Sequence, residues 1–137
     1  MTDDEPMSDA DYGTLARFRH ILRAFVAFSE DAARDAGVAP AQYQLLVMIR
    51  GWNGEGDPSI SDLAERLVLR HHSVVELVQR ARSAGLVETA GDPEDGRRQR
   101  VRLTPEGEHK LTVLGRLHRD ELRRFRADLA AIYTDLR

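Results

Sequence analysis

The sequence contains no cysteine, only one lysine and few aromatic residues, and these scarcities exclude several kinds of site. Without cysteine there is no disulfide, no cysteine-ligated zinc and no thiol redox sensor, and such a chain suits a reducing compartment. No apolar run approaches the roughly 20 residues that span a bilayer, so we expect no membrane partner. The first 11 residues are acidic and polar, unlike a signal peptide, so we expect the protein in the cytoplasm.

Signatures of catalysis and cofactor binding are also missing. The sequence has no glycine-rich phosphate loop, no nucleophile elbow and no histidine and glutamate set at metal-binding spacing. Asp92, Glu94 and Asp95 form a carboxylate cluster, but it falls in a predicted turn without apolar walls. The adjacent His71 and His72 would point about 100° apart on a helix, which does not suit a shared metal ion. We therefore expect no catalytic residue, no metal and no cofactor.

The 137 residues carry a net charge of −3, which hides a local excess of positive charge. Residues 1–12 contribute −5 and residues 13–65 contribute −2, whereas residues 66–102 contribute +3. Positive charge concentrated in one segment attracts a phosphate backbone. Of the 20 basic residues 19 are arginine, which suits bidentate contacts, although a GC-rich genome explains the same bias.

Apolar residues recur at helical spacing in the first part of the chain. We expect a disordered acidic tail over residues 1–11 and a helix over residues 12–36, which Gly37 ends. A second helix is predicted over residues 41–50, and a glycine-rich loop follows it.

The middle of the chain predicts a compact helical unit followed by a hairpin. Ser59 begins a short helix, and Asp62 three residues later completes a capping box. Another helix is predicted over residues 71–84. Two short strands, over residues 86–89 and 100–103, are then expected to pair across a turn rich in aspartate, proline and glycine.

Residues 105–137 are predicted to be helical throughout, with Thr104 as the N-cap and a possible bend near residues 115–119. The apolar side of this segment consists of Leu111, Gly115, His118, Leu122, Phe125, Leu129, Ile132 and Leu136. Their mean spacing of 3.5 residues is typical of a seam between helices, and it favours a homodimer over a core within one chain. The predicted dimer seam comprises Leu15, Phe18, Leu122, Phe125, Leu129, Ile132 and Leu136.

The order of these elements is that of a winged helix-turn-helix, a mainly α fold with a small β-hairpin wing. The helix over residues 71–84 is of a size that fits the major groove of DNA, and arginines at the hairpin tip suit the minor groove. The alternative for the hairpin is a solvated cluster of charges. The candidate DNA-binding residues are Ser59, Arg70, His71, His72, Ser73, Arg80, Asp95, Arg97, Arg98 and Arg100.

Three stretches carry a resemblance to a known family. They are residues 59–67 (SISDLAERL), residues 73–87, and the hairpin pattern Asp95-x-Arg97-x-x-x-Val101-x-Leu103-Thr104-x-x-Gly107. In this order they resemble the MarR family of bacterial transcriptional regulators, and the resemblance covers about residues 12–137.

The resemblance implies a homodimer joined by residues 12–36 and 105–137, with a DNA-binding lobe over residues 37–104. It implies a pseudo-palindromic operator in double-stranded DNA as the partner, and usually a repressor that a small ligand releases. It also implies that Asp95 orients the wing arginines and that Arg97 enters the minor groove. The chain departs from the usual family pattern at Arg70, Glu76 and Gln79.

Four aromatic or imidazole side chains are candidate ligand-binding residues. His20 and His118 lie on apolar faces of the predicted dimer helices. A histidine there more commonly makes hydrogen bonds within the core or interface than it binds a ligand. For Tyr43 and Trp52 packing is the commoner explanation, although the resemblance implies a ligand cleft between the dimer helices and the lobe, near the second helix. The rival to a DNA-binding regulator is a winged-helix protein-interaction module without DNA binding. The acidic tail and Glu76 favour that rival, and the wing arginines oppose it.

Overall fold

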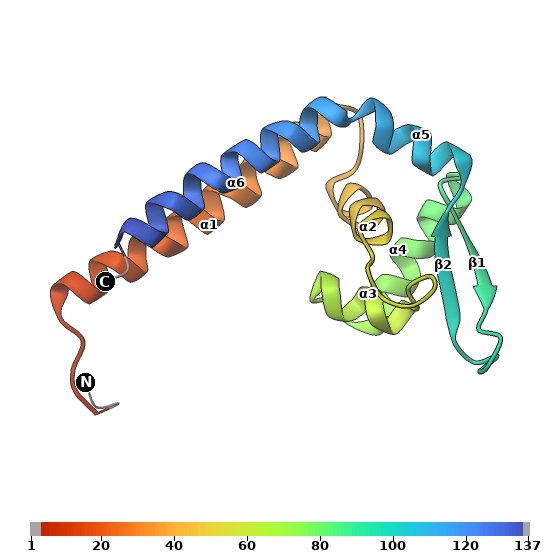
Figure 1. Cartoon of the computed structure of the whole chain (residues 1–137), viewed down its shortest axis with the longest axis horizontal. Coiled ribbons are helices and arrows are strands. Elements are labelled where there is room, and N and C mark those ends of the chain that lie inside the picture. The colour runs from red at the N-terminus through yellow and green to blue at the C-terminus, as the bar shows by residue number, and fades with distance from the viewer. Residues whose placement is uncertain (1–3, 136–137) are drawn as a thin grey trace.

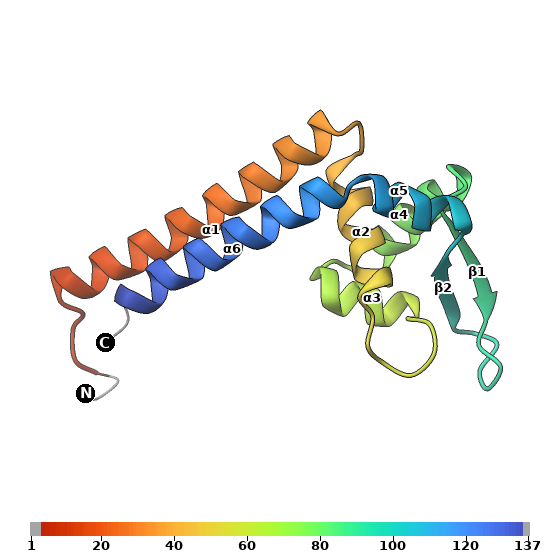
Figure 2. The same ribbon diagram turned by 45° about the horizontal axis from the view of Figure 1, so that its top comes forward.

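The computed structural model describes residues 4–135, in which two long helices run side by side away from a smaller lobe (Figures 1 and 2). No helix in this part of the chain is long and apolar enough to cross a membrane. Leu136, the last residue of the predicted seam, lies outside the described residues. The elements in chain order are α1 (Asp9–Asp35), α2 (Pro40–Arg50), α3 (Ile60–Leu67), α4 (His71–Ser83), β1 (Val87–Gly91), β2 (Gln99–Leu103), α5 (Pro105–Val113) and α6 (Gly115–Asp135).

Helix α1 begins three residues earlier than its apolar pattern predicts. Ser8 is the N-cap: its hydroxyl accepts from the backbone N–H of Asp11, whose carboxylate accepts from the N–H of Ser8, both at 3.1 Å. Asp9 and Asp11 also place negative charge in the first turn, where the helix dipole favours it. The predicted disordered tail over residues 1–11 is therefore too long, since residues 9–11 are helical. The prediction missed them because it used the spacing of apolar residues, and the capping residues are polar.

The core of the lobe lies where α2, α3 and α4 meet the hairpin. Ser59 caps α3 in a capping box with Asp62, as predicted. The α3–α4 turn contains Val68 at a φ of +54°, the only positive φ of a non-glycine residue among those described. A β-branched side chain in this region is strained, by about 1–3 kcal/mol, yet the Val68 side chain is largely exposed. The fully buried side chains of this core include Tyr43, Leu45, Leu46, Leu63, Val74, Val87 and Val101.

The wing is the antiparallel pair β1 and β2, in which Val87 faces Leu103 and Thr89 faces Val101. Val101 is buried while its neighbours Arg100 and Arg102 point to the other face, so the predicted alternation is confirmed. The backbone N–H of Val101 also donates to the carbonyl of Pro58 at 2.9 Å. This bond fastens β2 to the chain just before α3.

A tight joint links the end of the helix-turn-helix to α5. The carbonyl of Leu86 accepts from the N–H of Thr104 at 3.0 Å, and the Thr104 hydroxyl donates to the carbonyl of Gly85 at 2.6 Å. The same hydroxyl caps α5 by accepting from the N–H of Gly107 at 3.1 Å. Gly107 lies so close to the Leu86 carbonyl that a Cβ at this position would collide with it.

The C-terminal residues form two helices, and the break between them lies just before residues 115–119, where the sequence predicts a possible bend. Helix α5 ends at Val113, and the buried Leu114 occupies the break before α6 begins at Gly115. Leu114 packs into the lobe core, and this packing accounts for the break at that residue. From there α6 runs along α1 (Figure 2), and Phe25 meets Phe125 edge to face at 6.4 Å.

The close approach at Gly107 gives a test of the joint. We expect Gly107→Ala to lower the free energy of unfolding by about 1–3 kcal/mol, because backbone must shift to admit the methyl group. Gly13→Ala is the matched control: position 13 lies inside α1 with open space around it, so alanine should raise stability by roughly 0.5–1 kcal/mol. Urea denaturation of both variants measures the difference, and equal effects would contradict the tight joint.

Candidate functional site

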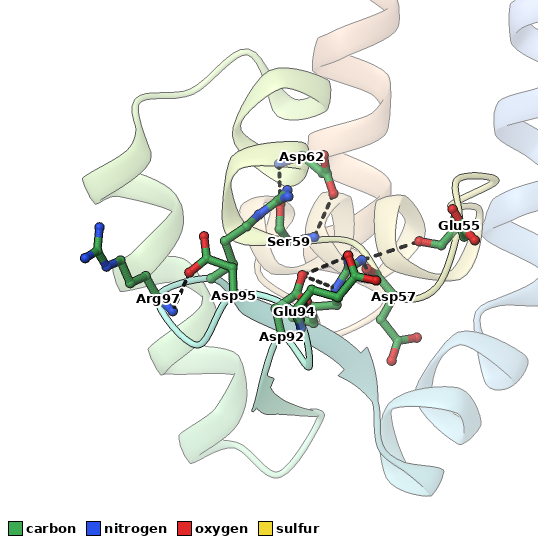
Figure 3. A network of polar contacts seen from close by, with 10 residues as sticks. Glu55, Asp57, Ser59, Asp62, Asp92, Glu94, Asp95 and Arg97 are labelled. Atoms are coloured by element: carbon green, nitrogen blue, oxygen red, sulfur yellow. Dashed lines mark hydrogen bonds and ion pairs between the residues drawn. The ribbon is translucent and has the colours of Figure 1, made fainter.

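The tip of the wing is a turn held by two aspartates through its own backbone (Figure 3). The Asp92 carboxylate accepts from the N–H of Glu94 at 2.8 Å, and the Asp95 carboxylate accepts from the N–H of Arg97 at 3.0 Å. The Asp95 carbonyl accepts from the N–H of Arg98, also at 3.0 Å. Short aspartate side chains that bond backbone two residues ahead are a standard means of fixing a turn.

Arg100 anchors the base of the wing. Its guanidinium donates to the buried Asp92 carboxylate at 2.9 Å, and it also bonds the backbone carbonyls of Glu55 and Asp57 in the loop before α3. The N–H of Glu94 and then Arg100 hold the pKa of Asp92 below its usual range. Arg100 therefore has a structural role at the wing base, and its contact with DNA stays a prediction.

Arg98 fastens the tip to the start of α3. Its guanidinium donates to the Ser59 hydroxyl at 3.0 Å, and the same hydroxyl caps α3. Ser59 is 1% exposed and its hydroxyl is bonded within the protein, while its contact with DNA stays a prediction. These bonds leave the tip seated against the helix-turn-helix.

Arg97 differs from both neighbouring arginines. It is exposed, and its guanidinium has no hydrogen-bond or ion-pair partner within residues 4–135. In Figure 3 its side chain points away from the polar network at the wing base. Asp95 bonds the backbone of Arg97 rather than its guanidinium, so it shapes the turn that presents this arginine.

The exposed side of α4 carries the remaining candidates. His71, His72 and Arg80 are exposed, and Ser73 is half-buried. Arg70 is the N-cap residue but makes no side-chain capping bond, so no side chain caps the first N–H groups of α4. Such a helix end, with positive side chains beside it, suits a phosphate group.

A cavity of about 590 Å³ lies where the long helices meet the lobe. Tyr43 and His118 are both in its wall, with ring centroids 5.6 Å apart, so the structure brings these two candidates together. The Tyr43 oxygen lies 2.7 Å from His118 Nδ1 and 3.1 Å from a Glu121 carboxylate oxygen. Burial, together with the Glu121 charge, raises the pKa of Tyr43 well above its usual range. The wall also contains Phe25, Val47, Arg50, Gly51, Glu108, Leu111, Thr112, Leu122 and Phe125.

His20 and Trp52, the other two ligand candidates, do not line this cavity. His20 is exposed on α1. Trp52 lies in the loop after α2, where the Arg66 guanidinium stacks 4.8 Å from its ring centre.

Sequence reasoning missed Glu121, Ser29 and the Asp92–Arg100 pair. Glu121 follows His118 by three residues and therefore shares its helix face, a spacing that identifies the pair in retrospect. Ser29 and Asp92 carry no such local signal, because their partners lie on other elements.

Comparison with known proteins connects this geometry to a family. The family model described as MarR family matches residues 36–98, from the end of α1 to the wing tip. Over 72 residues the chain is 32% identical to the transcriptional repressor IacR of Pseudomonas putida, and this match covers 53% of the chain and 43% of the relative. The matched region thus spans less than half the length of that curated relative.

Solved structures share the whole fold at low sequence identity. AbsC, a MarR family regulator of Streptomyces coelicolor, superposes with a TM-score of 0.78 at 21% identity, covering 91% of this chain and 84% of that one. A second S. coelicolor regulator, solved in complex with DNA, gives 0.75 at 22% identity, covering 87% and 77%. BpsR of Bordetella bronchiseptica gives 0.69 at 23% identity, covering 90% and 93%.

These findings confirm the predicted fold class, a mainly α winged helix-turn-helix with a hairpin wing. The family model covers the lobe that carries the wing and α4, and the solved structures extend the agreement to the long helices. The lobe is thus similar to the MarR family over residues 36–98, and the chain shares the fold of solved MarR family regulators.

Proposed function

We propose that the chain is a dimeric repressor that binds a pseudo-palindromic operator in double-stranded DNA and is released by a small ligand. In this function α4 enters the major groove, with His71, His72 and Arg80 on its exposed side. The wing reaches the neighbouring minor groove, where arginine meets a strongly negative potential. Because the proposed partner is chromosomal DNA, we expect the protein in the cytoplasm.

The observation that carries this proposal is the contrast among the wing arginines. Arg98 and Arg100 are bonded to the protein, whereas Arg97 is exposed beyond them with no partner in the described part of the chain. A solvated cluster of charges has no need of such an anchored base. A rigid turn that presents one guanidinium suits insertion into a groove, because little backbone freedom is lost on binding.

The dimer is supported by apolar side chains left open on both long helices. On α1, Leu15, Phe18 and Leu22 are 39%, 40% and 47% exposed. On α6, Leu122 and Leu129 are 55% and 51% exposed although both helices already pack together. Apolar stripes of this kind indicate a further partner, and a second copy would cover the stripes on both protomers by symmetry.

The ligand is assigned to the cavity at the junction of the long helices and the lobe. Its wall combines apolar side chains with Tyr43, His118 and Glu121, as small-molecule sites usually do. DNA binding by BpsR is regulated by 6-hydroxynicotinic acid, which supports a ligand of this size in a related fold. A molecule placed here would contact α1, α2, α5 and α6 together, and so would alter how the lobe sits on the dimer helices.

The second candidate function is a protein-interaction module that has lost DNA binding. The exposed Glu76 in the middle of α4 is the observation that favours it, because a carboxylate there repels phosphates. A glutamate also accepts from cytosine N4, so this residue is compatible with base contact. Binding to DNA itself distinguishes the two functions.

We expect the full-length protein to bind a palindrome in the DNA upstream of its own gene. Half-sites should lie about 10 base pairs apart, and affinity should fall steeply with salt, with a log–log slope of about −0.9 for each phosphate neutralised. Gel shift and fluorescence anisotropy at several salt concentrations measure this. A folded dimer that binds no such fragment at low salt would support the interaction module.

Replacing Arg97 and Arg100 should give different outcomes. Arg97→Ala should weaken operator binding about tenfold or more while leaving the melting temperature unchanged, because only a DNA contact is lost. Arg100→Ala should lower both affinity and stability, since it leaves the buried Asp92 carboxylate without its cation. Anisotropy and thermal denaturation of both variants check this, and an unchanged affinity for Arg97→Ala would show that the wing does not touch DNA.

Leu129→Arg should separate the dimer. An arginine in the middle of the apolar stripe on α6 would lose its hydration in the interface without gaining a partner. We therefore expect the dimer dissociation constant to rise at least tenfold, which corresponds to about 1.4 kcal/mol of binding free energy. Val113→Arg is the matched control, because Val113 is 61% exposed at the end of α5 and is not part of the apolar stripe on α6. Light scattering gives the oligomeric state, and a Leu129→Arg protein that stays dimeric would refute this interface.

A further inference from the structure

A chain of polar side chains crosses the junction between the lobe and the long helices. His118 and Glu121 on α6 both contact the Tyr43 hydroxyl on α2, at 2.7 and 3.1 Å. The other oxygen of Glu121 accepts from the Ser29 hydroxyl on α1, and Ser29 in turn accepts from the Gln44 amide at 3.4 Å. His118 Nε2 lies 2.9 Å from the carbonyl oxygen of Leu111 on α5. The network thus ties four helices together.

The number of protons in this network follows from its acceptors. The Leu111 carbonyl only accepts, so His118 Nε2 must carry a hydrogen. The Tyr43 hydroxyl has one hydrogen but faces two groups, His118 Nδ1 and Glu121. If the imidazole is neutral and the Glu121 carboxylate is ionised, both are acceptors there, and one of the two contacts brings lone pairs together without a hydrogen.

One additional proton satisfies every contact. With the proton on His118, Nδ1 donates to the Tyr43 oxygen and the Tyr43 hydroxyl donates to the Glu121 carboxylate. With the proton on Glu121, its acid group donates to Tyr43, which donates to the neutral His118. Both arrangements have zero net charge, and coupled groups of this kind hold the proton jointly. The raised pKa of Tyr43 means that the phenol itself keeps its hydrogen.

Among the described residues, no other side chain donates a hydrogen bond to the Tyr43 oxygen or to His118. Tyr43 is 1% exposed, and the ring of His118 stacks on it with an interplanar angle of 12°, an arrangement that suits a cation over an aromatic face. The other charged residues in the cavity wall are Arg50 on α2 and Glu108 on α5. These two pair with each other at 3.2 Å, so their charges offset one another beside the network.

We propose that His118, Tyr43 and Glu121 hold one extra proton that fastens α6 to α2, so that operator binding depends on pH. Loss of the proton leaves a net negative charge in the junction and breaks one of the contacts to Tyr43. The lobe is then less firmly held on the dimer helices, and affinity for the operator falls. This inference rests on the proposed function for its effect on DNA, whereas the proton itself is tested without DNA.

The direction of the pH effect follows from linkage. The folded network binds a proton that the unfolded chain releases at alkaline pH, so the stability it contributes is lost as pH rises. From pH 7 to 8.5 an unfolded histidine is already mostly neutral. In this range the folding equilibrium constant should fall by up to about tenfold per pH unit per protomer.

Glu121→Gln is the sharpest variant. A glutamine amide at this position donates to the Tyr43 oxygen, which donates to neutral His118, while the amide oxygen accepts from Ser29. Every contact is then made without the extra proton. We expect Glu121→Gln to be nearly as stable at pH 8.5 as at pH 7, and more stable than the wild type at pH 8.5. A role in packing alone predicts no gain at alkaline pH.

The experiment is urea unfolding of the full-length dimer at pH 7, 7.5, 8 and 8.5. The wild type and the control His109→Gln, which alters an exposed histidine on α5, should both lose stability with pH. Glu121→Gln and His118→Gln should lose markedly less. A Glu121→Gln protein with the wild-type slope overturns the proposal. Nitrogen-15 NMR of the imidazoles together with carbon-13 NMR of the glutamate carboxyls at pH 7 provides a second measurement, and a neutral His118 beside an ionised Glu121 in the wild type also overturns the proposal.

Operator binding at the same pH values tests the link to DNA. His71 and His72 are present in both proteins, so the comparison between wild type and Glu121→Gln isolates the junction. The wild type should weaken several-fold more than Glu121→Gln between pH 7 and 8.5, and equal weakening overturns the link. If the wild type binds no operator at any pH, the proposed function fails, and the unfolding data still decide whether the network holds the proton.

Discussion

The ion pair between Arg100 and Asp92 determines where the wing can lie. Because the same guanidinium also bonds the carbonyls of Glu55 and Asp57, it joins three segments: the wing base, its tip and the loop before α3. A nearly buried carboxylate needs its cation, so the pair resists opening. Arg98 adds a second attachment at Ser59. With both in place, the turn that presents Arg97 is held in a fixed position relative to the start of α3.

A second constraint lies at the other end of the lobe. Here the break at Leu114 turns the chain from α5 into α6, and the cavity opens beside it. The polar side chains of this wall are bonded across helices, whereas the apolar ones leave room for a ligand. The proposed ligand and the proposed proton therefore act at the same place, and each acts on contacts that hold α2 against α6. Regulation in this scheme needs no change within the DNA-contacting surface.

Patterns carried by neighbouring residues were predictable from the sequence. The capping box at Ser59, the alternation around Val101 and the order of elements all follow from short-range rules, and the structure and the solved relatives confirm them. Contacts between distant residues were not predictable. Arg100 alternates outward as expected, but nothing nearby indicates that Asp57 lies beyond it. Likewise, the capping role of Ser59 was predictable but its burial was not, because a capping residue can lie at the surface or inside the protein. Residue roles at the groove, including that of Arg97, stay predictions.

The length of the long helices has a mechanical consequence. Helix α1 has 27 residues, and at 1.5 Å per residue it extends about 40 Å. If the ends of these helices far from the lobe are held in a dimer, each helix is a lever that pivots at those ends and carries the lobe at its other end (Figure 1). A rotation of about 10° over such a length displaces the far end by roughly 7 Å, about two steps of the 3.4 Å rise between base pairs. In the proposed function, the α4 helices of the two protomers must fit grooves one turn apart. Small angular changes at the pivot are thus sufficient to put the lobes out of register with their half-sites.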